Sequence, residues 1–203
     1  LVNQLSNLSL QLYSWYIKNG HARNSKDISE LRGFFEKNLP ANAAKATGFY
    51  EKLYLYQSYV WYAFIRQDFL QYYRYSQKWV DAFTTYPELL KTETASYIKG
   101  VHNLMTAQFS LLNQDKLAKS IKQFEIFTKQ KFLQDNENNR ILAYQYLYTA
   151  RINLYFLQGN FTKGLRLVPF LEKMLKEYEL YLDTHRVLVF YYKIACLYFG
   201  SGD

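Results

Sequence analysis

Residue types that commonly do chemistry are few in this sequence and stand far apart. Histidine occurs at positions 21, 102 and 185, and none has a second His or Cys at the spacing of a zinc site. Cys196 lies in an apolar stretch without a neighbouring base, which predicts an inert, packed thiol. Residues 200–202 read Gly-Ser-Gly, which is too little for a phosphate-binding loop. We therefore expect no catalytic residue, no metal site, no cofactor and no enzymatic activity.

The second chemical signal is a basic charge balance. The 203 residues include 25 Lys and Arg against 17 Asp and Glu, a net charge of +8, and such a balance attracts nucleic acid or acidic proteins. An expected helix over residues 115–131 carries five lysines, several of which share one face: Lys116, Lys119, Lys122, Lys129 and Lys131. A solvated helix face is the ordinary interpretation, and an anionic partner is the functional alternative.

The composition is that of a globular, helical chain. Apolar residues make up 49%, with 21 Tyr, 15 Phe and 3 Trp against only three prolines and eight glycines, which suits heavily packed helices. No apolar run approaches the roughly 20 residues of a membrane span. The single cysteine excludes an internal disulfide and favours a reducing, cytoplasmic location. Because the chain begins with Leu1 and not Met, we expect a fragment of a longer protein, from which a targeting signal could have been removed.

An aromatic segment followed by a tight turn recurs along the chain. Residues 154–160, LYFLQGN, are matched by residues 197–203, LYFGSGD. With weaker copies included, the expected turn residues are Gly20, Gln67, Asp115, Gly159 and Gly202. The successive gaps of 47, 48, 44 and 43 residues indicate an internal repeat.

Helical periodicity on both sides of each turn predicts helix hairpins. First helices are expected over residues 44–66, 93–112, 138–157 and 184–199, and second helices over residues 68–85, 115–131 and 161–177. The hairpins are approximately residues 1–40, 44–86, 92–133 and 138–180, with half a hairpin at 184–203. Asp27 and Glu30 resemble a capping box, and Thr92 and Asp183 resemble N-caps.

These units resemble the tetratricopeptide repeat, whose first helix carries spaced aromatic residues before a Gly-Asp-Tyr type of turn. Tyr148 and Tyr155 match the aromatic sites, residues 159–161 match the turn, and Gly164 matches a small-residue site in the second helix. Arg151 departs from the pattern, and the period exceeds the family's 34 residues, which implies longer helices. The resemblance implies an all-α fold, a right-handed α-α superhelix (solenoid) of about four and a half antiparallel hairpins in one domain, residues 1–203.

The resemblance also implies a site, because first helices line the concave face of tetratricopeptide arrays. The inward positions are Tyr54, Gln57, Trp61, His102, Phe109, Tyr146, Asn153, Tyr192 and Lys193. Aromatic anchors with a few hydrogen-bonding groups suit a protein or peptide ligand, unless these residues pack between neighbouring hairpins. The alternatives are a helical-repeat nucleic-acid binder that uses the lysine face, and a peptide-sensing domain of a larger regulator.

The last expected helix carries an apolar face that a further helix would cover in a longer array. That face consists of Val187, Phe190, Ile194, Leu197 and Tyr198. We expect either a longer natural protein or self-association through residues 184–199, because exposed apolar surface marks an interface.

Overall fold

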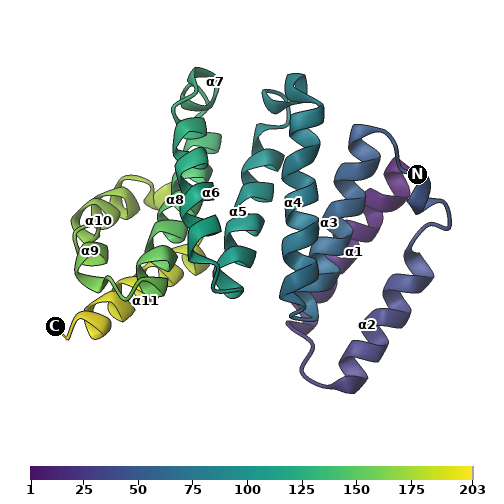
Figure 1. Ribbon diagram of the computed structural model, residues 1–203, viewed down its shortest axis with the longest axis horizontal. Coiled ribbons are helices and arrows are strands. Elements are labelled where there is room, and N and C mark those ends of the chain that lie inside the picture. The colour runs from purple at the N-terminus through teal and green to yellow at the C-terminus, as the bar shows by residue number, and fades with distance from the viewer. Residues whose placement is uncertain (203) are drawn as a thin grey trace. The chain divides into compact units, whose positions relative to one another are not determined.

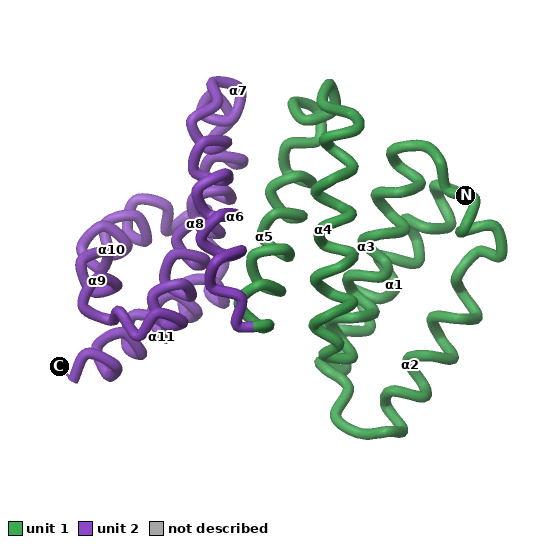
Figure 2. The backbone as a smooth tube through the Cα atoms, viewed as in Figure 1, with its two compact units in different colours: residues 1–111 green, residues 112–203 purple. Residues whose placement is uncertain are grey.

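The computed structural model describes residues 1–202, which form helices joined by turns and contain no β-strand. The all-α class predicted from the sequence is therefore confirmed. The chain divides into two compact units, residues 1–111 and residues 112–203, coloured separately in Figure 2. The boundary between them falls inside the third expected hairpin, residues 92–133.

Unit 1 contains five helices and includes an apolar cluster around Leu53 and Trp79 and another around Leu12 and Leu31. The helices are α1 (Val2–Asn19), α2 (Ser25–Asn38), α3 (Phe49–Ile65), α4 (Phe69–Thr85) and α5 (Thr94–Ser110), with 3-10 turns at Ala43–Lys45 and Pro87–Leu90. In Figure 1, α3 packs against α1 and α4, and α5 packs against α4. Leu31 and Phe35 bury the inner face of α2 against Leu8 and Leu12 of α1.

Unit 2 includes an apolar cluster around Ile152, Leu171 and Leu197. The helices are α6 (Gln114–Thr128), α7 (Lys131–Gln134), α8 (Glu137–Leu157), α9 (Phe161–Leu165), α10 (Val168–Glu177) and α11 (Thr184–Ser201), with a 3-10 turn at Glu179–Tyr181. Helix α8 packs against α6 and α9, and α11 packs against α9 and α8. A Cβ atom at Gly164 would clash with the buried Leu197 side chain, so the close approach of α9 and α11 requires glycine.

One left-handed residue follows α1, α3, α5, α8 and α11. Positive φ values occur at Gly20, Gln67, Leu112, Gly159 and Gly202, the complete set among residues 1–202. The sequence predicted four of these five positions. Asp115 is the wrong one, because it lies in the first turn of α6 and the left-handed residue is Leu112. The gaps become 47, 45, 47 and 43 residues, so the repeat persists with the corrected register.

The turns after α3 and α8 are the same hydrogen-bonded motif. Gln67 and Asp68 donate their N–H groups over 3.1 and 2.9 Å to the second-last and third-last helical carbonyls of α3. Gly159 and Asn160 donate over the same distances to the equivalent carbonyls of α8. This is the Schellman arrangement, which satisfies the free carbonyls at a helix end.

Asparagine or aspartate caps the start of α2, α4, α6, α8 and α11. Side-chain oxygens that accept an N–H at the start of a helix belong to Asn24, Asp68, Asn113, Asn136 and Asp183. The predicted N-cap at Asp183 is confirmed. The predicted box at Asp27 is wrong by three residues, because Asn24 is the cap. Thr92 is also wrong, since its hydroxyl donates backward to the Leu89 carbonyl and α5 begins at Thr94.

Three expected helices differ from the prediction by more than two residues at one end or by an internal break. Helix α3 starts at Phe49 and not at residue 44, because the Glu51 carboxylate accepts the Thr47 and Gly48 N–H groups and fixes the start there. These backbone hydrogen bonds, that from Thr47 first, lower the pKa of Glu51. The expected helix 161–177 breaks between α9 and α10, since Pro169 has no N–H to continue it. The expected helix 115–131 ends at Thr128, and Lys131 belongs to α7.

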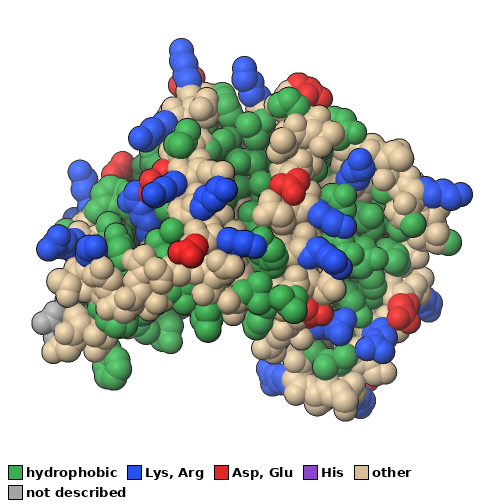
Figure 3. All heavy atoms as spheres, in the orientation of Figure 1, with side chains coloured by type: hydrophobic (Ala, Val, Ile, Leu, Met, Phe, Trp, Pro, Cys, Tyr) green, Lys and Arg blue, Asp and Glu red, His purple; other side chains and the backbone are tan. Residues whose placement is uncertain are grey.

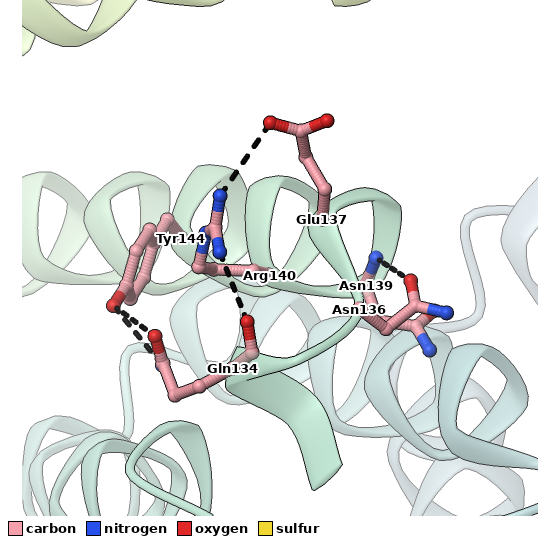
Figure 4. Close-up of polar contacts among 6 residues, drawn as sticks. All are labelled: Gln134, Asn136, Glu137, Asn139, Arg140 and Tyr144. Carbon is pink, nitrogen blue, oxygen red and sulfur yellow. Dashed lines mark hydrogen bonds and ion pairs between the residues drawn. The ribbon is translucent and has the colours of Figure 1, made fainter. Parts of the chain in front are cut away.

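Figure 4 shows the polar junction from which α8 extends. Gln134, the last residue of α7, contacts the Tyr144 hydroxyl through its Nε2 at 3.1 Å. Arg140 donates from Nη1 to the Gln134 carbonyl over 2.9 Å and forms an ion pair with Glu137 at 3.5 Å. Asn136 caps the first turn by accepting the Asn139 N–H. These contacts fix the start of the helix that supplies half of the candidate site.

Candidate binding surface

Helix α11 buries one face and leaves its opposite face open. Phe190, Ile194 and Leu197 are buried in the unit 2 core. A further helix was expected to cover these three residues, but α8, α9 and α10 already do so, whereas Tyr198 of the same predicted face is 44% exposed. Self-association through residues 184–199 stays a prediction. Leu188, Tyr192 and Phe199 are instead exposed, since a helix packed on one side only must present its opposite side to solvent.

The flank of α11 that meets α8 carries a lysine bound to an amide. The Lys193 ammonium donates to Oδ1 of Asn153 on α8 over 2.6 Å. Asn153 is buried and Lys193 is partly buried, and this burial lowers the pKa of Lys193, while the Cys196 thiol opposes the shift. No Asp or Glu among the described residues forms an ion pair with Lys193. An ammonium has three donors, so the site can still bind an acceptor.

A second basic side chain from α11 reaches α8 about two helical turns earlier. Arg186 donates from Nη1 to Oε1 of Gln145 over 2.9 Å and from Nε to Oδ2 of Asp183 over the same distance. Its guanidinium lies 5.5 Å from the centre of the Tyr146 ring, within cation–π range. The Asp183 carboxylate therefore balances the charge of Arg186, whereas the Asn153 amide leaves the charge of Lys193 unbalanced.

Tyr192 and Cys196 border the lysine on the open side of α11. Tyr192 is 71% exposed, and the neighbouring Cys196 thiol raises the pKa of its hydroxyl. Cys196 is a free, partly buried thiol. We use the name α8–α11 surface for the residues that these contacts connect: Gln145, Tyr146, Asn153, Arg186, Tyr192, Lys193 and Cys196.

The α8–α11 surface contains four of the predicted site residues: Tyr146, Asn153, Tyr192 and Lys193. A direct hydrogen bond joins Asn153 to Lys193. The sequence analysis did not select Gln145 or Arg186. The signal for Arg186 was its position three residues after the N-cap Asp183, where a side chain can both pair with the cap and reach a neighbouring helix.

The other five predicted residues lie in unit 1. All are partly buried, on α3 (Tyr54, Gln57, Trp61) and on α5 (His102, Phe109). The ring centres of Trp61 and Tyr13 are 5.1 Å apart, and those of the stacked Tyr54 and Tyr50 rings are 6.5 Å apart. Aromatic rings within unit 1 therefore already pack against Trp61 and Tyr54. The sequence analysis missed Tyr13, which is 45% exposed at the edge of this cluster.

The five predicted lysines are exposed. Lys116, Lys119 and Lys122 lie on α6, Lys129 ends that helix, and Lys131 begins α7. The lysines therefore do not share one helix, because α6 stops before Lys131. On the face drawn in Figure 3, Lys and Arg side chains are spread among hydrophobic and polar ones and do not form one patch.

Unit 1 also has a hollow between α1 and α2. Two adjoining cavities of about 460 and 420 Å³ share Trp15, Lys18 and Asn19 in their walls. The first also contacts His21, Arg23, Asp27 and Glu30 around the turn between the helices. Basic and acidic groups are mixed there, so the charge selects no ligand class.

The sequence matches no family model, and comparison with curated proteins and with solved structures finds no significant match. The tetratricopeptide resemblance therefore stays a prediction. Within residues 1–202, no three His, Cys, Asp or Glu side chains are grouped so that they could hold a metal ion. None of the described helices is both long and apolar enough to span a bilayer.

Proposed function

We propose that this chain is a non-enzymatic protein-interaction module and that the α8–α11 surface binds a segment of a partner protein. In this proposal the hairpins form a right-handed, tetratricopeptide-like superhelix of about four and a half hairpins, whose first helices include α8 and α11. The free cysteine suits a reducing compartment such as the cytoplasm.

The observation that supports this function is the Lys193 site. An ammonium held by one buried amide, with no carboxylate paired to it, keeps donors available at the edge of an exposed aromatic residue. Binding sites for protein segments combine an aromatic anchor with a few oriented polar groups in this way. The surrounding Arg186 contacts hold α8 and α11 in register, so the groups are positioned before a partner binds.

Photo-crosslinking tests this function. Peptides of about 16 residues are selected from a random display library on the purified chain. They are then exposed to a variant with p-benzoylphenylalanine in place of Tyr192, and to a control with the same group in place of Leu70, which is similarly exposed on α4. We expect crosslinks at position 192 and not at position 70. Crosslinking at neither position, or at position 70 alone, would show that the α8–α11 surface is not the binding site.

An anionic partner for the α6 lysines is the second candidate. The observation that favours it is that Lys119 and Lys122 are exposed one turn apart, with Lys129 exposed at the end of the same helix. Phosphate contacts of this kind weaken steeply with salt. A salt titration of binding to random-sequence nucleic acid distinguishes it from the first candidate, since a helix face that contacts phosphates gives a steep, lysine-dependent slope.

A further inference from the structure

The open face of α11 forms a continuous apolar stripe. Leu188, Tyr192, Ala195 and Phe199 recur at the spacing of one helix face, and all four are exposed. Tyr191 and Tyr198 border the stripe and are 51% and 44% exposed. In Figure 3 hydrophobic side chains reach the surface around the C-terminal end of α11.

The size of this stripe is that of an interface. A large aromatic side chain offers about 150–250 Å², so the exposed fractions of the four stripe residues together with Tyr191 and Tyr198 amount to roughly 600 Å², tyrosine hydroxyls included. This is the upper end of the largest patch on an ordinary monomer, about 300–600 Å², and approaches the ~800 Å² that one partner contributes to a stable complex. A straight stripe with helical spacing fits a second helix laid along it.

The charges around the stripe indicate which charge the partner helix carries. Residues 184–201 contain no Asp or Glu but include His185, Arg186 and Lys193. Arg186 already has Asp183 as its counter-ion, whereas Lys193 is hydrogen-bonded to the neutral Asn153 amide and has no carboxylate partner among residues 1–202. The α11 of a second copy carries no Asp or Glu, so it would bring no counter-ion to the Lys193 ammonium. A partner helix with carboxylates beside its apolar face meets both the stripe and the unpaired ammonium.

We propose that the α8–α11 surface, if it has the function proposed above, acts together with the adjoining apolar stripe of α11 to receive an acidic amphipathic helix. The helix lies along α11, its apolar residues contact Leu188, Tyr192 and Phe199, and one of its carboxylates accepts a hydrogen bond from Lys193. The apolar contacts supply most of the affinity, and the charge selects the partner and its register.

Designed peptides provide the test. An 18-residue helical peptide carries Leu at every i, i+3, i+4, i+7 position and Glu and Ala elsewhere. A second peptide has Lys in place of each Glu, and a third keeps the acidic composition in scrambled order. Binding to the wild-type chain is measured by fluorescence anisotropy at 150 mM NaCl. We expect the acidic amphipathic peptide to bind at least tenfold more tightly than either of the others.

Paired variants distinguish binding at the α11 stripe from non-specific hydrophobic binding. Leu188→Gln and Phe199→Gln should each weaken binding of the acidic peptide at least fivefold, whereas Leu70→Gln, at a leucine 70% exposed on α4, should change it less than twofold. The double variant Lys193→Met/Asn153→Leu should weaken it at least threefold. Lys173→Met removes one exposed positive charge from α10 and should leave binding unchanged. Circular dichroism of each variant checks that it is folded.

Several outcomes would overturn the proposal. Equal binding of the acidic and basic peptides would show that charge does not select the partner. A wild-type dimer in sedimentation equilibrium that Leu188→Gln dissociates would assign the stripe to a second copy. Binding to phosphatidylcholine–phosphatidylserine vesicles, lost in the same variant, would assign it to a membrane. If no designed peptide binds but library-selected segments crosslink at position 192, the partner class is wrong and the proposed function survives; if those segments bind elsewhere, the function itself is wrong.

Discussion

Lys193 and Asn153 show, at the scale of single residues, a polar pair whose burial does not favour folding. Burying an ammonium and an amide costs desolvation free energy, and the single 2.6 Å hydrogen bond between them offsets only part of it. Apolar side chains of similar size often replace such groups without loss of stability. We therefore expect Lys193→Met/Asn153→Leu to be as stable as the wild type or about 1 kcal/mol more stable in urea unfolding. Lys193→Met alone should cost about 1–3 kcal/mol, because it leaves the buried Asn153 oxygen unpaired.

The pH dependence of the same double variant checks the cause. Burial lowers the pKa of Lys193 in the folded state below its ordinary value of 10.5. Between the two values the unfolded chain binds more protons, so Lys193 makes the wild type gain stability as pH rises toward 10.5. The stability gap between the double variant and the wild type should therefore narrow with rising pH. A constant gap would mean that desolvation of the ammonium is not the cause.

Leu112 has a backbone conformation that is unfavourable for leucine. Its φ of 56° is left-handed, which a side chain with a Cβ disfavours by roughly 1–2 kcal/mol, and its side chain is 74% exposed. Leu112→Gly should raise the free energy of unfolding by about 0.5–1 kcal/mol, because glycine adopts this conformation freely. Leu70→Gly is the control, since Leu70 is 70% exposed in the first turn of α4, where the same change should cost up to about 1 kcal/mol. If both substitutions lower the free energy of unfolding, the left-handed conformation of Leu112 is not strained.

At the scale of helices, sequence periodicity predicted where helices are but not always where they stop. Helix α4 was expected over residues 68–85 and spans Phe69–Thr85, because its apolar residues recur with helical spacing. Capping decides the ends, and capping depends on which of several Asn, Asp or Thr side chains meets a free N–H. Asn24 does so and Thr92 does not, although both residue types favour the cap position. The turn at Leu112 escaped detection because leucine is rarely left-handed.

The candidate site was predictable in part for the same reason. Repeat register placed Asn153 and Lys193 on first helices, and their hydrogen bond follows from the packing of α8 beside α11. Register alone could not show which face of α11 the core would bury. Two apolar faces compete on that helix, and Gly164 decides between them by letting Leu197 approach α9 closely. That choice leaves Leu188 and Phe199 exposed.

Gly164 therefore controls how α9 and α11 pack. A Cβ at this position would clash with the Leu197 side chain, which is fully buried and has little room to move. Gly164→Ala should cost about 1–3 kcal/mol, the range for overpacking a core. Gly33→Ala is the control, because a Cβ there meets no atom within 4 Å on the surface of α2, and the substitution should stabilise by up to about 1 kcal/mol. Thermal unfolding of the two variants measures the difference, and equal shifts would show that the α9–α11 contact can relax.

At the scale of the whole molecule, the question is whether the two compact units unfold together. Helical repeats are stabilised mainly by contacts between neighbouring repeats. A core substitution therefore destabilises most strongly the repeats that contain or adjoin it. Leu53 lies in the unit 1 core and Leu171 in the unit 2 core, and truncating either to alanine should cost about 2–5 kcal/mol. Native-state hydrogen exchange should then show lost protection within residues 1–111 for Leu53→Ala, and within residues 112–202 for Leu171→Ala, with protection of the other unit largely retained. If either substitution lowers protection equally throughout, residues 1–203 unfold as the single cooperative domain expected from the sequence.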